Sequence, residues 1–115
     1  MKPILAIDPG AAGGYAWIDE SAIVHAEPMP DGMTAQADCL RSLSASLSAS
    51  LSASLPPLRA VVEKVGTYRP GNSGPAAATF ARHCGHIDAF LYLLGIPTTA
   101  VAPGVWQRRC GSLPK

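Results

Sequence analysis

The sequence has few aromatic residues, little charge and few cysteines. Of its 115 residues, 6% are aromatic and 15% are charged, whereas 48% are hydrophobic. This composition excludes a chain kept disordered by its own charge, and its core must be built from aliphatic side chains. Its three cysteines form no Cys-x-x-Cys pair. A disulfide framework is therefore not expected, and a reducing, cytoplasmic environment is favoured.

Long apolar runs and a strong net charge are also lacking. No run approaches the length that crosses a membrane, and the first apolar segment meets Asp8 before it could form a signal peptide. The net charge of +1 gives no global attraction for nucleic acid, so DNA binding would require a local basic patch. The length predicts a single domain over residues 1–115.

Short apolar runs separated by turn residues predict a mixed α/β chain. Strands are expected over residues 4–7, 15–19, 22–26, 58–65 and 96–101. Helices are expected from Thr34, as N-cap, to Leu55 and from Pro75 to Leu94, with a third helix beginning at Pro103. Gly95 is the expected stop of the second helix. This order predicts a mixed sheet flanked by helices.

A low-complexity repeat lies inside the first expected helix. Residues 43–55 repeat Leu-Ser-Ala-Ser three times, so that leucines recur every four positions. Leu40, Leu43 and Leu47 would share one helix face. We interpret the repeat as an expanded segment without a function of its own.

Two acidic residues stand out by their position in predicted strands. Asp8 ends one apolar strand and Glu63 lies near the end of another. If these strands are parallel neighbours, the two carboxylates meet at one sheet edge, where they repel unless a divalent cation lies between them. Two such ions can activate water and stabilise the leaving oxygen in phosphodiester hydrolysis. The alternative is that Asp8 caps a turn while Glu63 pairs with Lys64 or Arg59.

The glycines after Asp8 and the histidines of the second helix admit further interpretations. Gly13-Gly14 could present backbone N–H groups to phosphate, as in an ATPase hairpin, although a hairpin needs no ligand to explain its glycines. His83 and His86 suggest a metal, but zinc takes about four ligands and no second cluster supplies them. Cys84 is interpreted as a small buried residue.

Basic residues are spread over the second half of the chain. They could form the local patch that the net charge hides, and they are Arg69, Arg82, Arg108 and Arg109.

Three segments together resemble the RuvC-like Holliday junction resolvases of the ribonuclease H-like superfamily. ILAIDPGAAGGYAWID resembles that family's first hairpin, and AVVEKV its fourth strand with the catalytic glutamate. FARHCGHIDAFLYLLGIPTTAVAPGVWQRR is similar to the next helix and strand of phage and prophage members. There a Phe-x-Arg-x-x-Gly pattern and a Pro-x-x-Trp step are matched by Phe80, Arg82, Gly85, Pro103 and Trp106. The repeat lies outside the resemblance.

The resemblance implies a ribonuclease H-like fold, with a five-stranded sheet of order 3-2-1-4-5 and strand 2 antiparallel to the rest. It gives Asp8 and Glu63 the role of catalytic metal ligands for Mg²⁺ or Mn²⁺. It implies a homodimeric crossover junction endodeoxyribonuclease that nicks four-way DNA by metal-activated water, in recombination and repair. Candidate DNA contacts are then Tyr68, Arg69 and Arg82. The expected location is the cytoplasm of a bacterial or phage-infected cell.

The sequence departs from the family at its C-terminal end. The family places one or two further acidic residues on a final helix, whereas the sequence given stops at Lys115 and Asp88 is the sole acidic residue after Glu63. We therefore expect a domain that is incomplete at its C-terminus, with its final helix missing. The alternative to a nuclease is a catalytically inactive relic that binds DNA or a partner.

Overall fold

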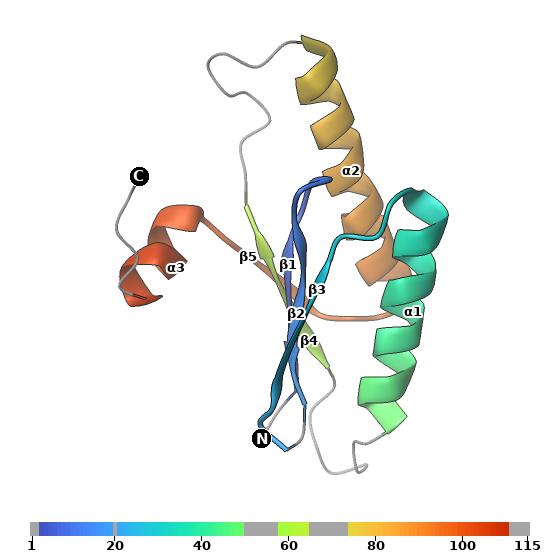
Figure 1. Cartoon of the computed structure of the whole chain (residues 1–115), viewed down its shortest axis with the longest axis vertical. Coiled ribbons are helices and arrows are strands. Elements are labelled where there is room, and N and C mark those ends of the chain that lie inside the picture. Colours follow the sequence, from blue (N-terminus) through green and yellow to red (C-terminus); the bar gives the residue numbers. More distant parts are fainter. Residues whose placement is uncertain (1–2, 20, 50–57, 65–73, 111–115) are drawn as a thin grey trace.

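The computed structural model describes residues 3–19, 21–49, 58–64 and 74–110. Its strands are β1 (Ile4–Asp8), β2 (Gly14–Ile18), β3 (Val24–Pro28), β4 (Arg59–Glu63) and β5 (Thr98–Val101). Its helices are α1 (Met33–Ala49), α2 (Gly74–Leu93) and α3 (Pro103–Cys110) (Figure 1). The order of elements is the one that the apolar runs predict. None of these described helices is both long and apolar enough to span a membrane.

The five strands form one mixed sheet. Their order is β3-β2-β1-β4-β5. The pairs β1–β2 and β2–β3 are antiparallel, whereas β1–β4 and β4–β5 are parallel. Strand β2 alone therefore runs against the others, and the sheet expected from the resemblance is confirmed.

In the part of the chain that the structure describes, one face of the sheet is covered by helices and the other is largely open. Helices α1 and α2 lie on the same side, and α3 lies on the opposite side (Figure 1). Burial along β1 alternates because successive side chains point to opposite faces: Leu5 and Ile7 are buried, whereas Ile4, Ala6 and Asp8 are exposed. The buried core also includes Tyr15, Ala60, Val62, Leu40, Leu47, Ile87 and Leu91.

A glycine precedes the first residue of α1, and another follows the last turn of α2. Gly32 has φ +85°, and its carbonyl accepts the N–H of Gln36 at 3.1 Å. The predicted cap at Thr34 is therefore wrong, because the chain turns at a glycine, which adopts positive φ at little cost. Gly95 has φ +70° and its N–H donates to Tyr92, which confirms it as the stop of α2.

The first part of the repeat belongs to the core. Helix α1 runs to Ala49, and Leu47 is 5% exposed while Leu43 packs against the buried cluster. The leucine spacing thus places these side chains on one helix face, as predicted. Residues 50–57, which contain the rest of the repeat, lie outside the described residues.

Candidate functional site

The sheet register brings Asp8 and Glu63 to the same edge. In the parallel pair β1–β4, Ile7 lies opposite Val62, and Asp8 and Glu63 are the next residues of their strands. Side chains alternate along a strand, so both carboxylates leave the sheet on the face opposite the buried Ile7 and Val62. Two acidic residues 55 positions apart in the sequence are therefore neighbours on the open face.

A cavity of about 740 Å³ lies along this open face. Small and branched apolar residues form much of its lining, and the two carboxylates border it. The lining includes Ala6, Asp8, Ala16, Val61, Glu63 and Val101. Its walls are mostly apolar, and the cavity is open to solvent.

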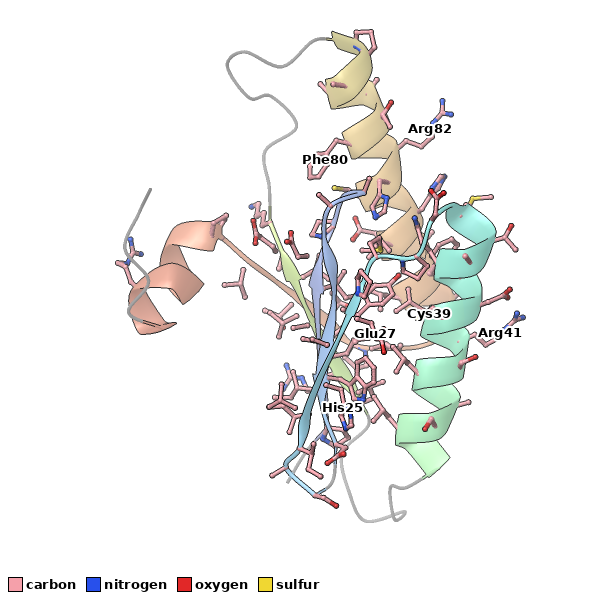
Figure 2. All side chains as sticks on the ribbon, in the orientation of Figure 1. His25, Glu27, Cys39, Arg41, Phe80 and Arg82 are labelled. Atoms are coloured by element: carbon pink, nitrogen blue, oxygen red, sulfur yellow. The ribbon has the colours of Figure 1, made fainter. Side chains whose placement is uncertain are left out.

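A third carboxylate borders the cavity but faces away from it. Glu27 is paired in register with Tyr15, whose side chain is buried under the helices. Its charge also contributes to raising the pKa of the Cys39 thiol on α1, after burial itself. Figure 2 shows both residues on the α1 side of the sheet. Glu27, which sequence reasoning did not weigh, is therefore unsuited to join Asp8 and Glu63 in holding a metal.

The alternative ion pairs of Glu63 are not found. Among the described residues, no salt bridge joins Glu63 to Arg59 or Lys64. Residues four apart on a strand are separated by about 13 Å, which is too far for Arg59 to reach a direct contact. Within the described residues, Glu63 therefore shares the sheet edge with Asp8 and forms no ion pair.

Asp8 and Glu63 fit a hard divalent cation. Mg²⁺ is commonly held by one or two protein carboxylates and completes its octahedron with water and phosphate oxygens. The described residues contain no group of three or more His, Cys, Asp or Glu side chains that could hold a metal ion. Two carboxylates match the number of protein ligands that a partly hydrated Mg²⁺ takes.

The histidines of α2 take part in helix packing. His86 stacks on Phe90 with 6.2 Å between ring centroids. His83 is half-buried, and burial, followed by the nearby His86, lowers its pKa. Cys84 is half-buried rather than fully buried as interpreted from the sequence, and burial raises the pKa of its thiol.

Backbone geometry accounts for the glycines after Asp8. A Cβ atom at Gly13 would lie 1.9 Å from the carbonyl oxygen of Asp8. Gly10 has φ +110°, and its carbonyl accepts the N–H of Gly13 at 3.0 Å. The turn between β1 and β2 therefore requires glycine at both positions without any bound phosphate.

The structure places only one of the three candidate DNA contacts predicted from the sequence. Tyr68 and Arg69 lie outside the described residues. Arg82 is exposed on α2 and points away from the sheet, on the side opposite the carboxylates (Figure 2). The structure thus does not bring Arg82 to Asp8 and Glu63.

Two other arginines lie on the carboxylate side of the sheet. Arg59 is exposed and alternates in β4 with the buried Ala60, which puts it on the same face as Glu63. Arg108 is exposed on α3, the helix on that side (Figure 1). The side chains of Trp106 and Arg109 lie outside the described part of the chain. Sequence reasoning missed Arg59 as a basic residue of this face, and a strand register was needed to find it.

The mixed sheet with this strand order, with helices on its two sides, defines a ribonuclease H-like fold. No family model and no curated protein matches the chain. Two solved structures of RuvC are similar. "T. thermophilus RuvC in complex with Holliday junction substrate" has a TM-score of 0.59 and 13% identity, over 94% of this chain and 69% of that one. "Thermus thermophilus RuvC structure" has a TM-score of 0.50 and 14% identity, over 96% and 69%. The chain therefore shares the fold of RuvC.

Proposed function

We propose that residues 1–115 form a single domain of a Holliday junction resolvase-like, divalent-metal-dependent endodeoxyribonuclease that acts on branched DNA. One observation carries the proposal: Asp8 and Glu63 lie side by side at the ends of parallel strands, on the open face of the sheet. The fold supports it, since one of the similar RuvC structures is a complex with a Holliday junction substrate.

The two carboxylates would hold Mg²⁺ or Mn²⁺ at the rim of the open-face cavity. When bound, such a metal lowers the pKa of its water and stabilises the charge on the oxygens of the scissile phosphate. The chain's own contribution is to position the two carboxylates. Asp8 and Glu63 present oxygen ligands on the face that α1 and α2 leave uncovered, where a DNA backbone can approach. Their mutual repulsion also favours cation binding.

Basic residues near this face would hold the phosphate backbone. Arg59 and Arg108 lie on the carboxylate side of the sheet, and Tyr68 and Arg69 follow β4 in the sequence. Each arginine that contacts a phosphate makes binding weaker as salt rises. We propose that Tyr68 and Arg69 contact the DNA strand being cut, and that Arg59 and Arg108 contact the phosphate backbone.

We also propose that the chain is a homodimer that pairs through the outer face of α2. At about 100° per residue, Ala78, Gly85, Ala89 and Tyr92 share the side that points away from the buried Ile87. A Cβ atom at Gly85 would meet nothing within 4 Å, and Tyr92 is 83% exposed. A smooth apolar helix face of this kind is typical of a helix–helix interface.

Charges on this face match when two copies of α2 run antiparallel. If the helices cross at Gly85, Arg82 of one copy lies opposite Asp88 of the other, and both residues are exposed in the single chain. The bulky Tyr92 would then rest on Ala78 of the second copy. Arg82 therefore has two competing proposed roles, a DNA contact or this ion pair, and its distance from the carboxylate side favours the ion pair.

A charge exchange on α2 separates the two roles of Arg82. Sedimentation equilibrium should show a weaker dimer for Arg82→Asp and for Asp88→Arg, and recovery in the double variant. Arg41→Asp on α1 is the matched control, because Arg41 is also exposed but pairs within its own helix with Asp38. A role in DNA binding would instead leave the dimer intact and weaken junction binding in Arg82→Asp.

Nicking of a synthetic four-way junction tests the nuclease. We expect cleavage in Mn²⁺ that is lost in Asp8→Asn and in Glu63→Gln. Glu27→Gln is the matched control, since this carboxylate borders the same cavity but faces α1. Equal cleavage by the wild type and the Asp8→Asn/Glu63→Gln variant would overturn the assignment. Junction binding that ignores both the metal and these substitutions would identify a binding domain without catalysis.

A further inference from the structure

Phe80 is the first residue of the Phe-x-Arg-x-x-Gly pattern in the second helix. It is half-buried on α2, and its side chain points toward the turn between β1 and β2 (Figure 2). A Cβ atom at Gly10 would lie 3.1 Å from Cε2 and 3.5 Å from Cδ2 of Phe80. The edge of the ring therefore lies against Gly10, where even a Cβ atom would make a tighter contact than most.

That turn is coupled tightly to Asp8. Gly10 accepts the N–H of Gly13, and Gly13 in turn approaches the carbonyl of Asp8 so closely that a Cβ atom would clash at 1.9 Å. Asp8, Gly10 and Gly13 therefore meet within one tight turn, backbone against backbone. A shift of Gly10 would be transmitted to the residue that carries the proposed metal ligand.

Helix α2, which carries Phe80, is anchored in the hydrophobic core. Ile87 and Leu91 of this helix are 0% and 1% exposed, and both belong to the buried cluster that includes Leu5 and Ile7 of β1. The ring therefore connects the rigid core with the outer side of the turn. An interior packed at this density has low compressibility and transmits strain between neighbouring groups.

We propose that Phe80 is a positioning residue for Asp8. Its ring holds the β1–β2 turn, the turn holds the backbone of Asp8, and the carboxylate is thereby kept in place beside Glu63. The metal part of this inference rests on the proposed function, whereas the support of the turn does not. Groups that orient a ligand in this way typically affect metal affinity by about 10- to 100-fold.

Two measurements on the full chain test the proposal. The first is Mn²⁺ affinity by titration calorimetry, which should fall about tenfold or more in Phe80→Ala and recover in Phe80→Tyr, which keeps the ring edge. The second is amide hydrogen exchange of Gly13 without metal, which should be faster in Phe80→Ala. Leu94→Ala is the matched control, since Leu94 is also half-buried against the core but follows the other end of α2.

The outcomes separate this proposal from the proposed function. Unchanged Mn²⁺ affinity and unchanged Gly13 exchange in Phe80→Ala would overturn the positioning role, as would equal losses in Leu94→Ala. If Asp8→Asn binds Mn²⁺ as tightly as the wild type does, the proposed function fails. In that case the rate of amide exchange at Gly13 still decides whether Phe80 supports the turn. Phe80→Leu takes the place of Phe80→Ala if the latter does not fold.

Discussion

The two faces of the sheet are built from alternate residues of the same strands, yet they differ in almost every property. On the helix-covered face, Leu5 and Ile7 are 0% and 2% exposed and join a continuous aliphatic core. On the open face, Ala6 and Asp8 of the same strand border a cavity beside Glu63. The comparison shows that period-two alternation lets five residues of β1 serve both stability and the candidate chemistry.

The largest effect is expected from the covered face. Leu5→Ala should lower the free energy of unfolding by about 2–5 kcal/mol, because it removes a fully buried side chain and leaves a cavity. Ile4, the residue before Leu5 in the strand, is 40% exposed, and Ile4→Ala should cost less than half as much. Urea unfolding measures both changes, and equal losses would show that the two faces do not differ in packing.

Glycine-to-alanine substitutions test the rim where the faces meet. Gly13→Ala should destabilise the fold by more than about 1 kcal/mol, because its Cβ atom would clash with the Asp8 carbonyl. Gly85→Ala on α2 meets open space and should stabilise the monomer by about 0.5–1 kcal/mol through helix propensity. Thermal unfolding at low concentration compares the two. The same sign in both variants would contradict the assigned geometry.

The helix-covered face contains a buried hydroxyl group whose ionisation affects stability, that of Tyr15. Tyr15 is 1% exposed, and its hydroxyl has no hydrogen-bond partner among the described residues. Burial, and then the nearby Cys39, raises its pKa to about 12 from 10.0. Because the unfolded chain ionises more readily, stability is fully present below pH 10 and declines as pH rises from 10 toward 12.

Tyr15→Phe should therefore have two effects. It should stabilise the fold by about 1 kcal/mol, since it removes a buried donor without a partner. It should also abolish the loss of stability above pH 10, which a series of urea titrations at increasing pH would detect. A variant that is less stable than the wild type would show that the hydroxyl is satisfied in solution.

Asp8→Asn is the open-face counterpart, with a smaller effect on folding. An exposed carboxylate outside the core should change the free energy of unfolding by no more than about 0.5 kcal/mol, while Mn²⁺ binding is lost. Chemical unfolding and calorimetry of the same sample test this separation. A loss comparable to that of Leu5→Ala would mean that Asp8 is a structural residue.

The smallest effect is expected at the far end of the β2–β3 hairpin. The Asp19 carboxylate accepts hydrogen bonds from the His25 ring at 2.8 Å and from the Ile23 and Ser21 N–H groups, and these bonds lower its pKa from 3.8. A lowered pKa adds stability that is present above pH 3.8 and is lost as pH falls below it. The Asp19–His25 pair is partly exposed, so solvent screens its contribution to stability. Asp19→Asn should flatten this part of the pH–stability curve.

Much of the fold could be predicted from local patterns, and the errors have local causes. Apolar runs located every element, but β3 begins at Val24 rather than at residue 22, because Ala22 has φ +65° and belongs to the hairpin turn. The strand extends to Pro28 because β3 lies at the sheet edge, where a proline is tolerated. The sheet order came from the resemblance, since periodicity does not specify which strands pair.

The candidate site could be predicted in part. Asp8 and Glu63 stood out as charges in apolar strands, and the register places them together, although their role as ligands stays a prediction. Arg59 and Glu27 could not be assigned to a face before the register was known, because a shift of one residue reverses the face of every side chain. The contact between Phe80 and Gly10 joins residues 70 apart in the sequence, beyond the reach of local patterns.

The Leu-Ser-Ala-Ser repeat lies in the connection that separates the two candidate ligands in the sequence. Strands β1 and β4 pair across a long stretch that includes α1, so one more or one fewer unit of four residues changes the loop-closure free energy by well under about 0.2 kcal/mol. Each added unit also returns a leucine to nearly the same helix face. A change in the number of units would therefore leave the pairing of β1 with β4, and with it the juxtaposition of Asp8 and Glu63, unchanged.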